Sequence, residues 1–312
     1  MKNYMAPMEG VTNHIYRNAY HQYFYPMDKY FTPFISAKPN KKLSKKEINE
    51  IAPETNQGLT VIPQILGNHA EDFIQTAELL KDYGHKEVNL NLGCPSGTVT
   101  AKGKGAGFLE KLDKLDRFLD TVFEQMDIKI SIKTRVGTED EEKWEDLLNI
   151  YNRYPLEELI IHPRILKDYY RNTPRIEAYR MAVNSCTAPL CYNGDLFTVE
   201  SYEKTASQFP ETQAMMLGRG LIQNPGLITE IQEKKKLNKT TLRAFHDKIY
   251  TDYQELMSGD RNVLFRMKEL WSYLIKSFEN HEKYEKKIKK AQKCSEYTAA
   301  VSSLFAEQEL IV

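Results

Sequence analysis

Short hydrophobic runs alternate with longer amphipathic stretches through most of the chain. The short runs are rich in Val, Ile, Tyr and Phe and stop at turn-forming residues, which is typical of β-strands. They end or turn at Met5–Met8, Tyr30–Ser36, Thr60–Leu66, Glu87–Leu92, Ile128–Thr134, Glu158–His162, Ala188–Tyr192 and Gln213–Leu217. The pattern therefore predicts eight strands.

The stretches between these runs have the periodicity of amphipathic helices. They include Ala70–Tyr83, Phe108–Met126, Glu141–Tyr154, Arg175–Asn184 and Val199–Phe209. Eight strands in alternation with helices match an α/β fold, the TIM (β/α)8 barrel. An open doubly wound sheet would instead place a Gly-rich dinucleotide turn after its first strand. The chain has Ala6-Pro7-Met8-Glu9-Gly10 at that point, so we expect the barrel.

The pattern changes to helix alone after Asn238. Leu242, Phe245, Ile249 and Tyr253 are spaced for one helical face, a second face runs from Leu264 to Phe278, and a third from Ile288 to Phe305. Such faces need one another as packing partners, which predicts a small all-α helical bundle. We therefore expect a barrel domain over residues 1–235 and a helical domain over residues 240–312.

Composition narrows the class of protein. The 312 residues are 41% hydrophobic, and no run approaches the length of a membrane helix. The four cysteines (Cys94, Cys186, Cys191 and Cys294) are scattered, without the paired spacing of a disulfide or metal framework. We expect a cytoplasmic, non-membrane protein with reduced thiols and no metal.

The formal net charge of zero conceals an uneven distribution. Residues 232–293 contain 16 Lys and Arg against 9 Asp and Glu, whereas residues 1–231 contain 27 against 31. A basic segment on a mildly acidic protein suggests a polyanionic partner. A solvated lysine-rich helical face is the equally acceptable alternative from charge alone.

Polar residues stand at the ends of six predicted strands, where a TIM barrel builds its active site. The segments are Gln64, Asn91-Leu92-Gly93-Cys94-Pro95, Lys133 with Arg135, His162-Pro163-Arg164, Asn193-Gly194-Asp195 and Gly218-Arg219-Gly220. The loops after strands seven and eight commonly bind phosphate through backbone N–H groups. Glycine permits close approach, and Arg219 adds a charge-assisted donor, so the last two segments predict a phosphate site.

Lys133 and Cys94, both at the ends of predicted strands, suggest which reactions the site could catalyse. Lys133 suits either a Schiff-base enzyme or a flavin enzyme, where its charge would lie beside the N1–C2 edge of the ring. Cys94 ends a strand and precedes a Gly-rich basic loop, Ser96–Gly107. That loop lacks the Walker A spacing, so we interpret it as a mobile loop that closes over a bound polyanion.

These segments together resemble a known family. Ala6-Pro7-Met8, Asn91-Leu92-Gly93-Cys94-Pro95, Ile132-Lys133-Thr134-Arg135, Asn193-Gly194-Asp195 and Gly218-Arg219-Gly220, in this order and spacing, resemble the tRNA-dihydrouridine synthases. The resemblance covers residues 4–230 by motif and the C-terminal helices by architecture. The strand-six segment departs from it, because the family usually has His-Gly-Arg-Thr where this chain has His162-Pro163-Arg164-Ile165.

The resemblance implies an FMN enzyme that reduces the C5–C6 bond of a uridine in tRNA, with NADPH or NADH as reductant. Hydride would pass from flavin N5 to C6, and Cys94 would give a proton to C5 as general acid. The implied FMN contacts are Pro7, Met8, Gln64, Lys133 and His162, with the phosphate on Asn193, Gly194, Asp195, Gly218 and Arg219. The implied substrate contacts are Asn91, Arg164, Lys102 and Lys104, and a tRNA-sized ligand suits a monomer.

Two other functions remain open at this point. One is an FMN barrel reductase for a free pyrimidine, similar to dihydroorotate dehydrogenase. The other is a phosphosugar lyase or isomerase that uses Lys133. The basic helical segment favours the tRNA enzyme, because a small substrate does not need it.

Overall fold

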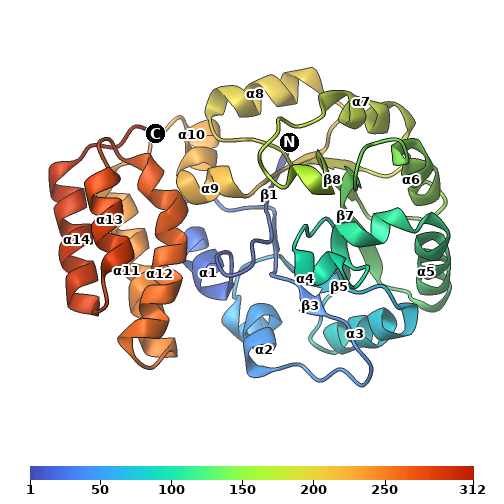
Figure 1. The fold of residues 1–312 in the computed structure, drawn as a ribbon, viewed down its shortest axis with the longest axis horizontal. Helices are drawn as coiled ribbons and strands as arrows, with labels where there is room; N and C mark the ends of the chain where they lie inside the picture. The colour runs from blue at the N-terminus through green and yellow to red at the C-terminus, as the bar shows by residue number, and fades with distance from the viewer. The chain divides into compact units, whose positions relative to one another are not determined.

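The computed structural model describes residues 1–312, which form two compact units (Figure 1). The first unit comprises residues 1–7, 28–195 and 204–217, and the second comprises residues 8–27, 196–203 and 218–312. None of the helices combines the length and apolar composition needed to span a bilayer. The division into domains 1–235 and 240–312 stays a prediction.

The first unit is built on ten parallel strands. They are β1 (Lys2–Met5), β2 (Lys29–Phe31), β3 (Ile35–Ser36), β4 (Val61–Ile62), β5 (Gln64–Leu66), β6 (Glu87–Leu92), β7 (Lys129–Gly137), β8 (Leu159–Ile165), β9 (Leu190–Tyr192) and β10 (Ala214–Leu217). Its helices are α2 (Lys45–Ile51), α3 (Ala70–Asp82), α4 (Gly97–Thr100), α5 (Leu112–Gln125), α6 (Trp144–Tyr151) and α7 (Ile176–Ser185), while α8 (Val199–Gln208) contributes to both units.

The ten strands close into a barrel. Their order is β3-β5-β6-β7-β8-β9-β10-β1-β2-β4. Because β2 and β3 are two halves of one strand, and β4 and β5 two halves of the next, both ends of this order belong to the same neighbouring pair. Eight barrel strands result, so the TIM-barrel prediction is confirmed and the open sheet is excluded.

Two prolines cause the interruptions. Pro33 separates β2 from β3, and Pro63 separates β4 from β5, because proline has no N–H to give to the ladder. Thr32 bridges the gap: its N–H donates to the Ile62 carbonyl at 3.1 Å, and its hydroxyl accepts from the Gln64 N–H at 3.1 Å.

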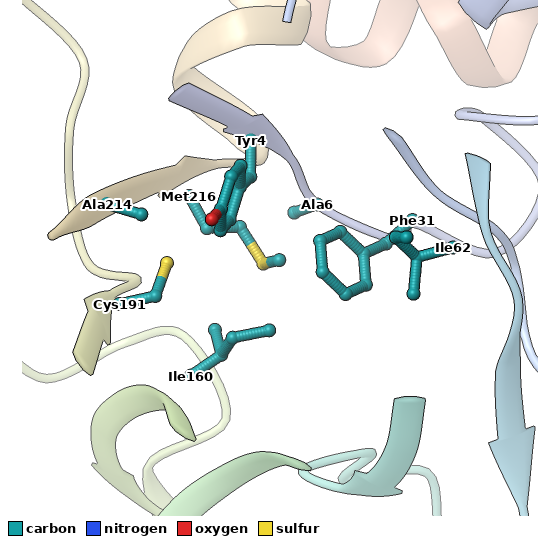
Figure 2. Packing of buried hydrophobic residues seen from close by; sticks show 8 residues of the cluster. All are labelled: Tyr4, Ala6, Phe31, Ile62, Ile160, Cys191, Ala214 and Met216. Atoms are coloured by element: carbon teal, nitrogen blue, oxygen red, sulfur yellow. The ribbon is translucent and has the colours of Figure 1, made fainter. Parts of the chain in front are cut away.

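The barrel interior has an apolar side and a polar side. Figure 2 shows the apolar packing, which brings together side chains from β1 and the residue after it, β2, β4, β8, β9 and β10: Tyr4, Ala6, Phe31, Ile62, Ile160, Cys191, Ala214 and Met216. The opposite side, formed by β5, β6 and β7, carries buried polar side chains such as Gln64, Asn89 and Ser131. This asymmetry determines where the site can form.

The second unit is entirely helical apart from its loops. Its helices are α1 (His14–Tyr23), α9 (Arg219–Gln223), α10 (Leu227–Glu233), α11 (Lys239–Leu256), α12 (Asp260–Leu274), α13 (Glu282–Lys290) and α14 (Cys294–Glu307). The predicted C-terminal bundle is present, but the stretch expected as one helix from Ile288 to Phe305 is divided between α13 and α14.

A buried hydrogen-bonded chain joins three helices of this unit. The Trp271 indole N–H donates to the Tyr297 hydroxyl at 2.7 Å, and that hydroxyl lies 2.5 Å from Nε2 of His246. The Tyr297 hydroxyl accepts from Trp271, and it donates to Nε2 of His246 when that nitrogen carries no hydrogen. The Asp247 carboxylate can only accept, so Nδ1 of His246 donates to it at 2.8 Å, and burial lowers the pKa of the ring and so favours its neutral form.

We expect the stability of the protein to fall as pH drops below about 6.5. Burial lowers the pKa of His246 in the folded chain, whereas the unfolded chain takes up a proton near pH 6.5. The unfolded state therefore binds more protons in that range, and stability rises with pH. His246→Gln should cost about 1–3 kcal/mol at pH 7.5 and reduce the slope of melting temperature against pH between 5 and 7. A variant with the wild-type slope would exclude His246 as its source.

Candidate active site

The carboxyl ends of the barrel strands gather most of the predicted site residues of the first unit. Asn91 belongs to β6, Lys133 to β7 and His162 to β8, and Asn193 directly follows β9. Asn91 pairs in register with Lys133, so these two side chains occupy equivalent positions on adjacent strands. The polar side chains at these strand ends therefore lie at the same end of the barrel.

Three groups form hydrogen bonds to the backbone of the turn that contains Cys94. The side-chain oxygen of Asn91 accepts from the Gly93 N–H at 3.1 Å and from the Cys94 N–H at 2.9 Å. The Ala106 N–H donates to the Cys94 carbonyl at 3.1 Å. Cys94 is half-buried, and these bonds fix the backbone that carries its side chain.

Arg135 is the third of these groups, and the sequence analysis gave it no role. Its guanidinium donates to three backbone carbonyls, those of Gly93 at 2.9 Å, Ile165 at 2.8 Å and Tyr169 at 2.8 Å. It thereby joins the Cys94 turn to the loop after β8. Its place two residues after Lys133 on one strand was the available signal, since both then face the same side.

The loop after Cys94 is folded back rather than extended. It forms α4 and a short 3-10 helix at Gly105–Glu110. The Asn68 amide donates to the carbonyls of Lys102 at 3.0 Å and Gly103 at 3.1 Å. The Lys104 ammonium donates to the Ala37 carbonyl at 3.2 Å, whereas Lys102 is exposed. Their predicted substrate contacts stay predictions.

Lys133 has an altered acidity. Burial, and then the nearby charge of Arg135, lower its pKa to about 8. An anionic ligand beside the ammonium would oppose both effects and favour the charged form. The residue is therefore suited to interact with a group that gains negative charge.

His162 and Arg164 form a buried pair. Arg164 is 1% exposed, and its guanidinium donates to Nε2 of His162 at 2.9 Å, to the Asn172 carbonyl at 2.6 Å and to Asp195. Because arginine only donates, Nε2 of His162 accepts, and the ring hydrogen lies on Nδ1. This use of the whole guanidinium favours a positioning role for Arg164. The predicted substrate contact stays a prediction.

The segment after β9 has a separate steric constraint. A Cβ atom on Gly194 would lie 2.1 Å from the Tyr192 hydroxyl, so only glycine fits. The Asn193 amide donates to the Met216 carbonyl at 2.8 Å. Asp195 accepts from Arg164 at 3.0 Å. These contacts hold the side chains of Asn193 and Asp195 on either side of Gly194, and the predicted phosphate contacts of the segment stay predictions.

The remaining predicted cofactor residues divide between the units. Pro7 is partly exposed at the end of the β1 segment in the first unit. In the second unit, the Met8 N–H donates to the Thr12 hydroxyl at 2.7 Å, and Gly218 precedes α9. Arg219 stacks over Phe197, and a Cβ on Gly220 would lie 1.8 Å from the Leu196 carbonyl.

Three polar residues of the barrel interior, Glu87, Asn89 and Ser131, were missed as well, although their neighbours Asn91 and Lys133 were predicted. In β6 every second residue, Glu87, Asn89 and Asn91, is polar although the whole strand is buried. Strict alternation means that the three share one face, which here is the inward one. The same period extends to Ser131 and Lys133 in β7, and this alternation was the signal that could have identified them.

Comparison with known sequences gives one consistent result. A family model described as "Dihydrouridine synthase (Dus)" matches residues 4–309. The tRNA-dihydrouridine synthase B of Pasteurella multocida (strain Pm70) is 24% identical over 225 residues, or 72% of this chain and 67% of the relative. A probable tRNA-dihydrouridine synthase 1 of Synechocystis sp. is 26% identical over 289 residues, or 88% and 78%.

Solved structures share the fold at low sequence identity. A variant of NCR from Zymomonas mobilis has a TM-score of 0.57 at 16% identity, covering 81% of this chain and 94% of its own. Morphinone reductase has a TM-score of 0.54 at 13% identity, covering 78% and 88%. These similarities support the barrel architecture.

We expect Gly105→Ala to displace the Cys94 turn and Gly97→Ala to leave it in place. Gly105 has φ +56°, and an added Cβ would lie 2.8 Å from the Cys94 carbonyl oxygen, whereas nothing lies within 4 Å of one on Gly97. The strained variant should lose about 1–3 kcal/mol of stability. Its Cys94 thiol should react with iodoacetamide at a changed rate, measured by peptide mass spectrometry. Equal rates in the two variants would contradict the close packing of the loop on Cys94.

Proposed function

The chain belongs to the dihydrouridine synthase family, and from that premise we propose how it acts as a tRNA-dihydrouridine synthase on the C5–C6 bond of a uridine. The observation that carries the assignment is the family match over residues 4–309. The Cys94 turn at the end of β6 supports it, because it presents a thiol from a fixed backbone.

We propose FMN as the cofactor and NADPH or NADH as the reductant. The residues fit a flavin: amide, imidazole and ammonium donors lie at the ends of parallel strands, and Gly194 permits close backbone approach. Held by these residues, the flavin would supply the hydride-transfer chemistry that links the nicotinamide to C6 of the base. Lys133 and His162 are the proposed ring contacts with Pro7 and Met8, and Asn193, Gly194, Asp195, Gly218 and Arg219 the proposed phosphate contacts.

The protein's own groups would do three things in the reaction. The Lys133 ammonium favours negative charge beside it. Cys94 holds a proton and gives it to C5 of the base. Asn91 orients the Cys94 turn through its side-chain oxygen, and its amide is the proposed contact to the uracil. Gln64 is completely buried and hydrogen-bonded to Asn91 at 2.7 Å, so it holds the Asn91 amide in place, and its predicted contact to FMN stays a prediction.

We propose that the exposed lysines of α13 contribute to tRNA binding. Lys286, Lys287, Lys289 and Lys290 are all exposed within the nine residues of this helix. Contacts from such side chains to phosphates are independent of sequence and release counterions. We further propose that the protein acts as a monomer in the cytoplasm.

We expect Cys94→Ala to retain flavin and its reduction by the nicotinamide but to form no dihydrouridine in tRNA, since only the proton donor is removed. Cys186→Ala, which removes another partly exposed thiol, serves as the control and should keep wild-type turnover. Both are measured as nicotinamide oxidation and as dihydrouridine by mass spectrometry. Undiminished product from Cys94→Ala would remove Cys94 from the mechanism.

We expect reversal of Lys286, Lys287, Lys289 and Lys290 to Glu to weaken tRNA binding and reduce its dependence on salt. Each lost phosphate contact should lower the slope of log affinity against log salt by about 0.7–0.9. The same reversal at the exposed residues Lys86, Lys114, Lys129 and Lys204 is the charge-matched control. If both variants bind tRNA with the same affinity and slope, the tRNA lies elsewhere.

A further inference from the structure

The polar side of the barrel interior is a continuous chain of hydrogen bonds. Ser131 donates to Glu87 at 2.9 Å, Asn89 donates to Ser131 at 3.0 Å, Gln64 donates to Asn89 at 2.8 Å, and Asn91 donates to Gln64 at 2.7 Å. The last link is the Asn91 oxygen, which accepts from the Gly93 and Cys94 N–H groups. The chain therefore runs from the amino end of β6 to the Cys94 turn.

Both ends of this chain impose one direction on it. Backbone N–H groups can only donate, so Asn91 must turn its oxygen to the Cys94 turn and its NH2 group to Gln64. At the other end Glu87 is paired with Lys29 at 2.7 Å, and a carboxylate can only accept. Each amide between them has one orientation in which every bond joins a donor to an acceptor.

Alternative partners within the barrel are poor. Ser131 has a second acceptor, the Val88 carbonyl, but at 3.5 Å it is longer than the bond to Glu87. Gln64, Asn89 and Ser131 have no exposed surface, so water does not replace a lost link. A buried amide that loses its partner must turn over or move, and its neighbours then face donor against donor or acceptor against acceptor.

We propose that Ser131 and Asn89 are positioning residues for the reaction: they hold the amides nearer the site in one orientation and so fix the Cys94 turn. This inference rests on the proposed function for its effect on turnover. Neither residue reaches the carboxyl end of its strand, and their influence passes through Gln64 and Asn91. Glu87, with Lys29 and Glu158 around it, closes the chain at the amino end of the barrel.

Because the chain of hydrogen bonds runs in one direction, two substitutions of Asn89 should have different effects on Gln64. Asn89→Asp keeps an oxygen that accepts from Gln64, so the orientation of that amide should survive. Asn89→Leu has a similar size but offers no acceptor, so Gln64 is released. At the next link Ser131→Ala removes the hydroxyl, and Ser131→Thr restores it. Thr134→Val is the control, because it removes a buried hydroxyl from the outer face of the same strand, where Thr134 contacts Tyr151.

Amide hydrogen exchange on a peptide containing Gly93 and Cys94 tests the structural claim without cofactor or substrate. We expect exchange about tenfold faster in Asn89→Leu and Ser131→Ala, and close to wild type in Asn89→Asp, Ser131→Thr and Thr134→Val. Unchanged exchange in both Asn89→Leu and Ser131→Ala, or equal acceleration in Thr134→Val, would overturn the proposal.

The functional claim is tested by single-turnover oxidation of the reduced enzyme by tRNA. We expect a loss on the order of tenfold or more in Asn89→Leu and Ser131→Ala, with rescue in Asn89→Asp and Ser131→Thr. Faster exchange with wild-type turnover would show that the turn is held but that its position does not matter, which also overturns the proposal. If the wild type itself makes no dihydrouridine, the proposed function fails, and the exchange measurement still decides whether the chain of bonds exists.

Discussion

A buried polar side chain in the packed interior of a barrel is costly unless it has a hydrogen-bond partner. In this protein the constraint falls on one side of the barrel, where β5, β6 and β7 carry Gln64, Asn89 and Ser131. The opposite side is filled with apolar side chains (Figure 2). The polar side satisfies the constraint with a single directed chain of hydrogen bonds that ends on the backbone of the Cys94 turn. The position of that thiol thus depends on the barrel interior as well as on its own loop.

Much of the fold could be predicted from local patterns. Strands such as β6 and helices such as α3 were visible, because alternation and helical periodicity are properties of consecutive residues. The helical bundle followed in the same way. The gap between α13 and α14 was harder to see, because their apolar faces follow one another and only three residues separate them. The two barrel strands that Pro33 and Pro63 interrupt were predicted as single strands. Each pair of halves does occupy the place of one strand in the closed barrel.

The candidate site was predicted as a set of residues but not as a geometry. Strand-end motifs identified Cys94, Lys133 and His162, because strand ends are defined along the chain. The partners of these groups come from strands far apart in sequence, and their contacts depend on register. Arg164 illustrates this: its ion pair with Asp195 crosses from β8 to the segment after β9 and occupies a guanidinium that the sequence suggested for substrate. For the same reason Arg135 was named without a role, and Asn89 was not named at all.

The central claim is that this barrel reduces a uridine within tRNA. It is tested most directly with tRNA from cells that lack the gene, incubated with the purified protein and NADPH and mapped by mass spectrometry. We expect a yellow protein and the addition of two hydrogens to a uridine that is unmodified in the starting tRNA. A colourless protein that stays inactive when FMN is supplied, or a flavoprotein that reduces a free pyrimidine and leaves every tRNA uridine unchanged, would contradict it.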